Sequence, residues 1–301
     1  MLQFSSSIET VVANHSEAME ADTILKNERS LKKIFFPVFF LVFFCIAASA
    51  QSVSQIKGEV VFSNDEVVFH RIDSHTWVGT GNLMFSESLY LVEGNDRAVL
   101  IDVGTKIADL DKIVASITSK PITLLATHVH PDHTGSAISY FPEIWISAGD
   151  TVNIPWVMGN YKGKINFLKD GEILELGGRQ LEVVFTPGHT PGSVTFIDTK
   201  AGYGFSGDSF GSGNLILGVD FSTLIATCQK MEPVMQKYNI KYFYPGHFNG
   251  TNLETPQRIK DLITLSRDVM SGKVEGKPNQ YGGLVVNDYN VNIVYNEQQM
   301  K

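Results

Sequence analysis

The chain has 301 residues, with 32 acidic and 24 basic side chains and a formal net charge of −8 at pH 7. This acidic balance, without a long basic run, argues against a nucleic-acid substrate, because phosphate binding needs a basic face. Only two cysteines are present, Cys45 and Cys228. Two are too few for a disulfide framework or a thiolate metal cage.

The first feature in chain order is an apolar N-terminal segment. Two lysines precede the apolar run Ile34–Ala47, and the small residues Ala48-Ser49-Ala50 follow it. This order is typical of a secretory signal, with cleavage expected before Gln51. The run has about 14 residues, fewer than the roughly 20 that span a bilayer as a helix. A retained membrane anchor is therefore the weaker alternative. We therefore expect residues 1–50 to be removed, leaving an exported protein, periplasmic or secreted, with no stable membrane span.

The first half of the remaining chain reads mainly as strands. Runs rich in β-branched and aromatic residues, broken by Gly and Asn-Asp turns, predict strands over Glu66–Ile72, His75–Thr80, Ser88–Glu93, Ala98–Val103, Ile122–Ala126 and Glu143–Ser147. Apolar residues at helical spacing predict a helix over Ile107–Thr118. The composition of Ile122–Ala126 predicts a fully buried strand.

The second half combines strands with two longer helices. Strands are predicted over Glu172–Leu176, Leu181–Phe185, Ser193–Thr199, Tyr203–Phe205 and Tyr242–Tyr244, with one or two more in the tail from Tyr281 to Tyr295. Helices are predicted over Phe221–Tyr238 and Pro256–Ser271. Strands followed by alternating strands and helices fit sheets covered by helices on their outer faces. We expect one domain over residues 51–301.

The loop after the buried strand Ile122–Ala126 carries an unusual cluster of polar side chains. His128, His130, Asp132 and His133 follow one another in an H-x-H-x-D-H pattern, which holds three of the chain's 8 histidines. Imidazole nitrogens and carboxylate oxygens are the ligands that a zinc-type cation prefers. A surface loop that happens to be rich in histidine is the alternative. The pattern predicts a metal site.

Three further candidate ligands lie at predicted strand ends in the second half. His189 lies between two Pro-Gly turns, Asp208 follows a Ser-Gly turn, and His247 follows a Pro-Gly turn. Taken alone, each residue is weak evidence for a metal ligand, because such residues commonly cap helices and fill turns. Together they place one ligand at each of several strand ends, and loops on a rigid scaffold are where binding sites are built.

The order H-x-H-x-D-H, G-H-T, G-D and P-G-H resembles the metal signature of the metallo-β-lactamase superfamily, and the resemblance covers essentially all of residues 51–301. It implies an α/β fold, a four-layer αβ/βα sandwich with two sheets face to face, helices outside and the metals at one sheet edge. It also implies a metal-dependent hydrolase.

The resemblance assigns the ligands residue by residue. It implies a first metal on His128, His130 and His189, a second on Asp132, His133 and His247, and a bridge between them at Asp208. Asp102 matches a family aspartate that supports the metal loop by accepting a hydrogen bond. An ordinary turn residue is the alternative for Asp102.

The ligand set implies a mechanism. Two divalent ions would share a water, lower its pKa toward about 7 and supply a bridging hydroxide that attacks a carbonyl. Asp132 would act in catalysis by orienting this nucleophile and passing on its proton. We expect two Zn²⁺ ions, although ligands of this kind also suit Fe or Mn.

We expect an exported dinuclear-zinc hydrolase of a small-molecule ester, lactone, thioester or β-lactam. The cysteine-free set resembles glyoxalase II and acyl-homoserine lactonases, but the short segment after His247 and the predicted export disfavour glutathione thioesters. One alternative is a bona fide β-lactamase, because Asp208-Ser209 matches a histidine-rich β-lactamase subclass. Another is a mononuclear iron oxidoreductase like the persulfide dioxygenases, against which the complete second-metal set argues. A metal-binding protein without turnover is a third.

One loop is a candidate substrate wall. Asn153–Tyr161 is apolar and aromatic, interrupted by helix breakers, and includes Trp156 and Tyr161. The resemblance implies that such loops flank the metals and contact the substrate, and the apolar composition of this one favours an apolar acyl group. Simple packing into the core is the alternative.

Overall fold

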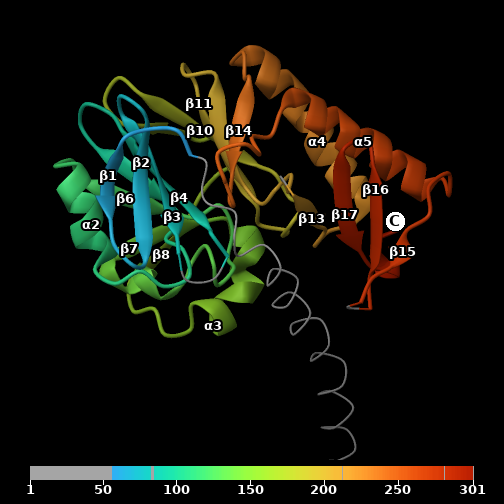
Figure 1. Ribbon diagram of the computed structural model, residues 1–301, viewed down its shortest axis with the longest axis horizontal. Helices are drawn as coiled ribbons and strands as arrows, with labels where there is room; N and C mark the ends of the chain where they lie inside the picture. The colour runs from blue at the N-terminus through green and yellow to red at the C-terminus, as the bar shows by residue number, and fades with distance from the viewer. Residues whose placement is uncertain (1–55, 83–84, 212, 281, 301) are drawn as a thin grey trace, which may run out of the picture. The chain divides into compact units, whose positions relative to one another are not determined.

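Figure 1 shows the fold as a computed structural model, which describes residues 56–82, 85–211, 213–280 and 282–300. The predicted signal segment lies outside the described residues, so its removal stays a prediction, as does the single domain over residues 51–301. Within the described ranges, no helix is long and apolar enough to cross a bilayer.

The first sheet has eight strands that pair in chain order. They are β1 (Val60–Ser63), β2 (Val67–Asp73), β3 (Thr76–Gly81), β4 (Ser88–Glu93), β5 (Ala98–Ile101), β6 (Ile122–Leu125), β7 (Glu143–Ile146) and β8 (Lys164–Phe167). β1 to β5 are antiparallel, whereas β5 to β8 are parallel. Parallel neighbours need crossover connections. α2 (Leu110–Ile117), η1 (Ser136–Tyr140), and η2 (Ala148–Asn153) with α3 (Ile154–Val157) supply them.

The second sheet has five strands in the order β14-β12-β11-β10-β9. They are β9 (Ile173–Glu175), β10 (Gln180–Phe185), β11 (Val194–Asp198), β12 (Tyr203–Gly207) and β14 (Tyr242–Pro245). β9 to β12 form an antiparallel meander, and β14 pairs parallel with β12 after a crossover through α4 (Phe221–Lys237). The carboxyl ends of β12 and β14 therefore lie at one edge.

A third sheet of four strands was not predicted from the sequence. Its order is β13-β17-β16-β15, with β13 (Asn214–Ile216), β15 (Lys277–Pro278), β16 (Leu284–Asp288) and β17 (Val291–Tyr295). β16 and β17 are the strands expected in the tail. β13 pairs with β17 across a long sequence separation, Leu215 opposite Ile293. A three-residue strand with a partner so distant has no local sequence signal.

Both long helices begin with a residue whose side chain caps the first turn. The Asp220 side chain accepts a hydrogen bond from the Thr223 amide at the start of α4. At α5 (Pro256–Met270), Thr255 accepts one from the Arg258 amide and proline occupies the first turn. These side chains satisfy amide groups that have no partner within the helix.

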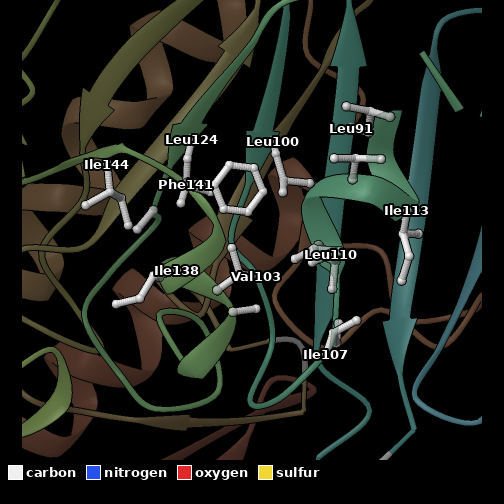
Figure 2. Packing of buried hydrophobic residues seen from close by; sticks show 14 of the residues in the cluster. Leu91, Leu100, Val103, Ile107, Leu110, Ile113, Leu124, Ile138, Phe141 and Ile144 are labelled. Carbon is white, nitrogen blue, oxygen red and sulfur yellow. The ribbon is translucent and has the colours of Figure 1, made fainter. Parts of the chain in front are cut away.

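Three clusters of buried side chains define the layers. One lies between the first and second sheets and includes Tyr90 and Phe196. Another packs α2 and η1 on the outer face of the first sheet, where Leu110 and Phe141 lie near Leu100 (Figure 2). A third packs α4 and α5 on the second sheet, with the third sheet beyond them (Figure 1). The predicted four-layer sandwich is confirmed.

Candidate metal centre

All seven side chains named from the sequence meet at one edge of the sandwich. The histidine loop follows β6, His189 lies between β10 and β11, and Asp208 and His247 follow β12 and β14. Backbone hydrogen bonds join these loops, from the Val194 amide to the Thr127 carbonyl at 2.8 Å and from the Gly246 amide to the Gly207 carbonyl at 2.8 Å. Two sheets thus contribute to one site.

The first cluster consists of His128, His130 and His189. The Nδ1 atom of His130 lies 3.1 Å from His128 Nε2 and 2.9 Å from His189 Nε2. The Nδ1 atom of His189 lies 2.8 Å from the Ile216 carbonyl oxygen. A carbonyl only accepts, so Nδ1 carries the proton and Nε2 presents its lone pair to the cluster. Zn–N bonds of about 2.0–2.1 Å place tetrahedral ligands roughly 3.4 Å apart, so the cluster has the right size for zinc.

The second cluster consists of Asp132, His133 and His247. Asp132 Oδ2 lies 3.5 Å from His247 Nε2 and 3.8 Å from His133 Nε2. Each histidine donates its outer N–H to an oxygen, His133 Nδ1 to Asp102 at 2.8 Å and His247 Nδ1 to the Phe85 carbonyl at 3.2 Å. Both Nε2 atoms, the ones left to bind a metal, therefore face inward.

The His133 ring provides the test of metal fit. Its Nε2 atom is buried and has no hydrogen-bond partner. An unpaired buried polar atom is destabilising by about 1–3 kcal/mol, so native proteins rarely keep one without a ligand. The atom points to the carboxylates of Asp132 and Asp208, which are cation ligands as well. This donor set fits a divalent metal.

Asp208 lies between the two clusters. Its Oδ2 atom is 3.8 Å from His189 Nε2 in the first cluster and 3.7 and 3.4 Å from the Nε2 atoms of His133 and His247 in the second. One carboxylate thus reaches both groups. This is the placement that a bridging ligand requires.

Asp102 supports the histidine loop from beneath. It is 1% exposed, and it accepts hydrogen bonds from the Thr127 amide at 2.7 Å, the Thr127 hydroxyl at 2.8 Å and His133 Nδ1 at 2.8 Å. The φ of Asp102 is 63°, in the left-handed region, which is incompatible with a strand. β5 therefore ends at Ile101, two residues before the predicted end at Val103. The predicted acceptor role is confirmed.

Two glycines let the backbone approach the site closely. A Cβ atom at Gly246 would lie 2.2 Å from Asp208 Oδ1 and 2.7 Å from His133 Cε1. A Cβ atom at Gly207, whose φ is 53°, would lie 2.4 Å from Thr127 Oγ1. The Gly-His and Gly-Asp pairs of the sequence are therefore steric requirements of the site.

The two clusters differ in their electrostatics. Burial lowers the pKa of His130 to about 3 and the pKa of His128 well below its usual value. Burial therefore favours the neutral form of His128 and His130, which is the form that binds metal.

In the second cluster, carboxylates outweigh burial. Burial alone would lower the pKa of His133, but Asp132 and Asp208 raise it well above its usual value. Asp208 likewise raises the pKa of His247 to about 9. Burial would raise the pKa of Asp208, yet His247 and His133 hold it well below its usual value. This strongly negative field favours a cation.

The family model described as Metallo-beta-lactamase superfamily matches residues 84–247, more than half of the chain. The chain belongs to this superfamily. It is 27% identical over 213 residues to the acyl-coenzyme A thioesterase MBLAC2 of Homo sapiens, covering 57% of this chain and 76% of that protein. It is 27% identical over 202 residues to the hydroxyacylglutathione hydrolase GloC of Haemophilus influenzae, covering 60% and 93%.

Solved structures show the same fold. A metallo-beta-lactamase from Pontibacter korlensis superposes with a TM-score of 0.55 at 20% identity, covering 67% of this chain and 100% of that one. The DIM-1 metallo-beta-lactamase gives a TM-score of 0.53 at 16% identity, covering 69% and 98%. The predicted superfamily and fold are confirmed, and the chain is a metal-dependent hydrolase. The role of each individual ligand stays a prediction.

The loop expected as a substrate wall divides into two parts. Tyr161 packs against the core beneath the first sheet, and its hydroxyl donates to the Phe141 carbonyl at 3.0 Å. Core packing thus accounts for Tyr161. Trp156 is 44% exposed, and Val152, which directly precedes this loop, is 70% exposed. A substrate-contacting role for Trp156 stays a prediction.

The sequence did not point to three groups that orient the site. The carbonyls of Phe85 and Ile216 hold two histidine rings, and Asp150, which is fully buried, lies behind the first cluster. Backbone carbonyls leave no trace in a sequence. An aspartate after glycine reads as an ordinary turn.

Proposed function

We propose that this chain is an exported dinuclear zinc hydrolase of acyl thioesters. The observation that supports two ions is the position of Asp208, whose carboxylate lies within 3.8 Å of a histidine from each cluster. A single-iron site needs only one of these clusters, so the iron oxidoreductase is the weaker alternative. The export proposal rests on the order of residues around Ile34–Ala47.

The thioester proposal rests on the relatives. Their names describe hydrolysis of acyl groups joined to coenzyme A or to glutathione. The β-lactamases that superpose on this chain are under 25% identical and share the fold, which does not fix the substrate. The exposed side chains of Val152 and Trp156 offer apolar surface for an acyl chain.

The chain's own residues have distinct roles in this proposal. Zinc held by the two clusters would supply a nucleophile at neutral pH and a Lewis acid for the carbonyl. Asp208 fixes the spacing of the clusters. Asp132, whose side chain is 17% exposed, accepts the proton of the attacking water and returns it to the departing thiolate. Asp102 and the Phe85 carbonyl keep the rings of His133 and His247 in the ligating orientation.

The test measures thiol release from acyl-coenzyme A by the zinc-loaded protein, with acyl-glutathione, a homoserine lactone and a chromogenic cephalosporin as comparison substrates. We expect rapid thiol release that a chelator abolishes, that zinc restores, and that His130→Ala lacks. Cephalosporin turnover without thiol release from a protein holding two zinc ions would instead make this chain a β-lactamase. N-terminal sequencing of protein from outside the cytoplasm tests export, with Gln51 as the expected first residue.

A further inference from the structure

The short helix η2 lies directly behind the three-histidine cluster. Its Asp150 side chain is fully buried, and Oδ2 accepts hydrogen bonds from the Val129 amide at 2.8 Å and the Thr190 hydroxyl at 2.9 Å. Oδ1 accepts one from the Gly192 amide at 2.8 Å. Val129 separates two of the three histidines, and Thr190 follows the third. One carboxylate therefore ties together the two loops that build the cluster.

A second side chain of η2 acts on the same peptide. The Asn153 side-chain amide donates to the Val129 carbonyl at 3.2 Å. Asp150 and Asn153 are three positions apart in a 3₁₀ helix, so they share one face. The Val129 backbone is thus held at both its N–H and its C=O group, and Val129 itself is fully buried.

The backbones of η2 and the His189 loop are in direct contact. A Cβ atom at Gly149 would lie 2.7 Å from the Pro191 carbonyl oxygen, and one at Gly192 would lie 2.4 Å from Asp150 Cγ. Such close approach leaves the loops no freedom to shift around Asp150. The hydrogen bonds therefore fix a geometry, because packing prevents slack between the loops.

Asp150 depends on these hydrogen bonds. Burial raises the pKa of its carboxyl, and each of its hydrogen-bond donors in the described part of the chain is neutral. No cation among these donors offsets the burial, so the three hydrogen bonds hold the carboxyl group in place.

We propose that η2 is a positioning element for the three-histidine cluster, in which Asp150, assisted by Asn153, fixes His128 and His130 against His189. The affinity of this cluster for its ion therefore depends on Asp150. This inference rests on the proposed assignment of the three histidines to one ion. Asp150 does not contact the ligand atoms and acts through the loops.

The test is the zinc affinity of full-length Asp150→Asn, measured by competition with a coloured chelator. An asparagine keeps the shape, but its NH₂ group cannot accept a hydrogen bond. The single-cluster backgrounds His247→Ala and His189→Ala separate the two sites. We expect affinity to fall about 10–100-fold in the His247→Ala background, as is typical for residues that orient metal ligands, and to stay unchanged in the His189→Ala background.

Cobalt gives an independent readout. In the cobalt-loaded His247→Ala background, Asp150→Asn should change the visible absorption bands, because these report ligand geometry. Thr190→Val, which removes one of the three donors to Asp150, should produce a smaller change in the same direction. If Asp150→Asn does not fold, Thr190→Val carries the test alone, and unchanged affinity would then refute the inference.

Asp198→Asn is the matched control. Asp198 is 1% exposed and also accepts three hydrogen bonds, from Arg179 Nε at 2.7 Å, the Lys200 amide at 3.0 Å and the Ala201 amide at 2.8 Å. It lies four residues along β11 from Val194, about 13 Å from the metal edge. We expect this variant to lose thermal stability while keeping its zinc affinity.

The outcomes are distinguishable. If Asp150→Asn behaves like Asp198→Asn, with lower stability but unchanged affinity at both clusters, Asp150 is a structural residue and the inference is wrong. If the unsubstituted protein itself binds no zinc at the three-histidine cluster, the metal assignment under the proposed function fails, and this inference fails with it.

Discussion

Replacing Gly246 by alanine tests the packing of the second cluster. The added Cβ would lie 2.2 Å from Asp208 Oδ1 and 2.7 Å from His133 Cε1, whereas ordinary van der Waals contact begins near 3.4 Å. The φ of Gly246 is not in the left-handed region, so alanine brings no backbone strain. The Cβ would also lie 3.2 Å from the Gly207 backbone carbon, but its two shortest contacts are with proposed ligands, which the substitution would displace.

The size of this displacement sets the expected effect. To restore contact distance, the Asp208 carboxylate must move by about 1 Å relative to the Gly246 backbone. A misplacement of about 1 Å at a reacting centre can reduce turnover by roughly 100-fold. We therefore expect kcat/KM for thioester hydrolysis to fall at least about 100-fold, equivalent to roughly 2.8 kcal/mol. Zinc binding at the second cluster should weaken in parallel.

The assay combines zinc content per chain with thiol release. Gly213→Ala is the matched control, because nothing lies within 4 Å of a Cβ built there and its φ is not in the left-handed region. This control should keep both activity and metal. Full zinc content and unimpaired turnover in Gly246→Ala would show that Asp208 and His133 do not act in the placement described.

Two further predictions concern the site, and a third concerns Glu254, a buried residue whose carboxyl accepts a hydrogen bond from the Ser206 hydroxyl at 2.6 Å. Asp208→Ala should reduce zinc from two ions to one or none per chain, and metal analysis that recovered both ions would remove the bridging role. Asp102→Asn, which cannot accept the His133 N–H equally well, should lower activity about 10–100-fold; rescue by zinc excess would place the defect in affinity. Burial raises the pKa of Glu254 to about 7, so its stabilising protonated form is present below pH 4.5 and lost as the pH rises through 7. Glu254→Gln should therefore gain up to about 3 kcal/mol relative to the unsubstituted protein between those pH values in chelator-treated urea unfolding, and a constant difference would contradict this.

The candidate ligands were predictable because each one has a recognisable pattern in its immediate sequence neighbours. Glycine precedes Asp208 and His247 where the backbone passes too close to other atoms for a Cβ. The H-x-H-x-D-H loop follows β6, which was predicted to be fully buried; Leu124 and Leu125 are buried, whereas Ile122 and Thr123 are partly exposed. The pairing of the strands within each sheet then brings the loops that carry these ligands to one edge. No further sequence motif is needed to predict that they meet.

The groups that orient the site were not predictable in this way. His189 is held by the carbonyl of Ile216, which lies on β13, a three-residue strand that pairs with β17 far along the chain. Asp150 accepts hydrogen bonds from the amides of Val129 and Gly192. Both residues lie more than 20 positions from Asp150 in the sequence, so no local pattern predicts these hydrogen bonds. Non-local pairing of short segments is a property of the packed fold and leaves no periodic signal.

Tyr161 shows how tertiary packing decided an ambiguous segment. Its loop alternates apolar residues with helix breakers, a pattern that fits both a substrate wall and a core element. In the structure its hydroxyl donates a hydrogen bond to the Phe141 carbonyl, and its ring packs against the core. Trp156, five residues earlier, stays 44% exposed. The same loop thus anchors the first sheet at one end and offers apolar surface at the other.

The most direct test of the proposed thioesterase activity is thiol release from acyl-coenzyme A by the purified protein, measured before chelation, after chelation and after zinc is returned. We expect release that disappears with the metal, returns with zinc and is absent in His130→Ala. Protein that holds two zinc ions per chain and releases no thiol from any acyl-coenzyme A or acyl-glutathione would contradict it.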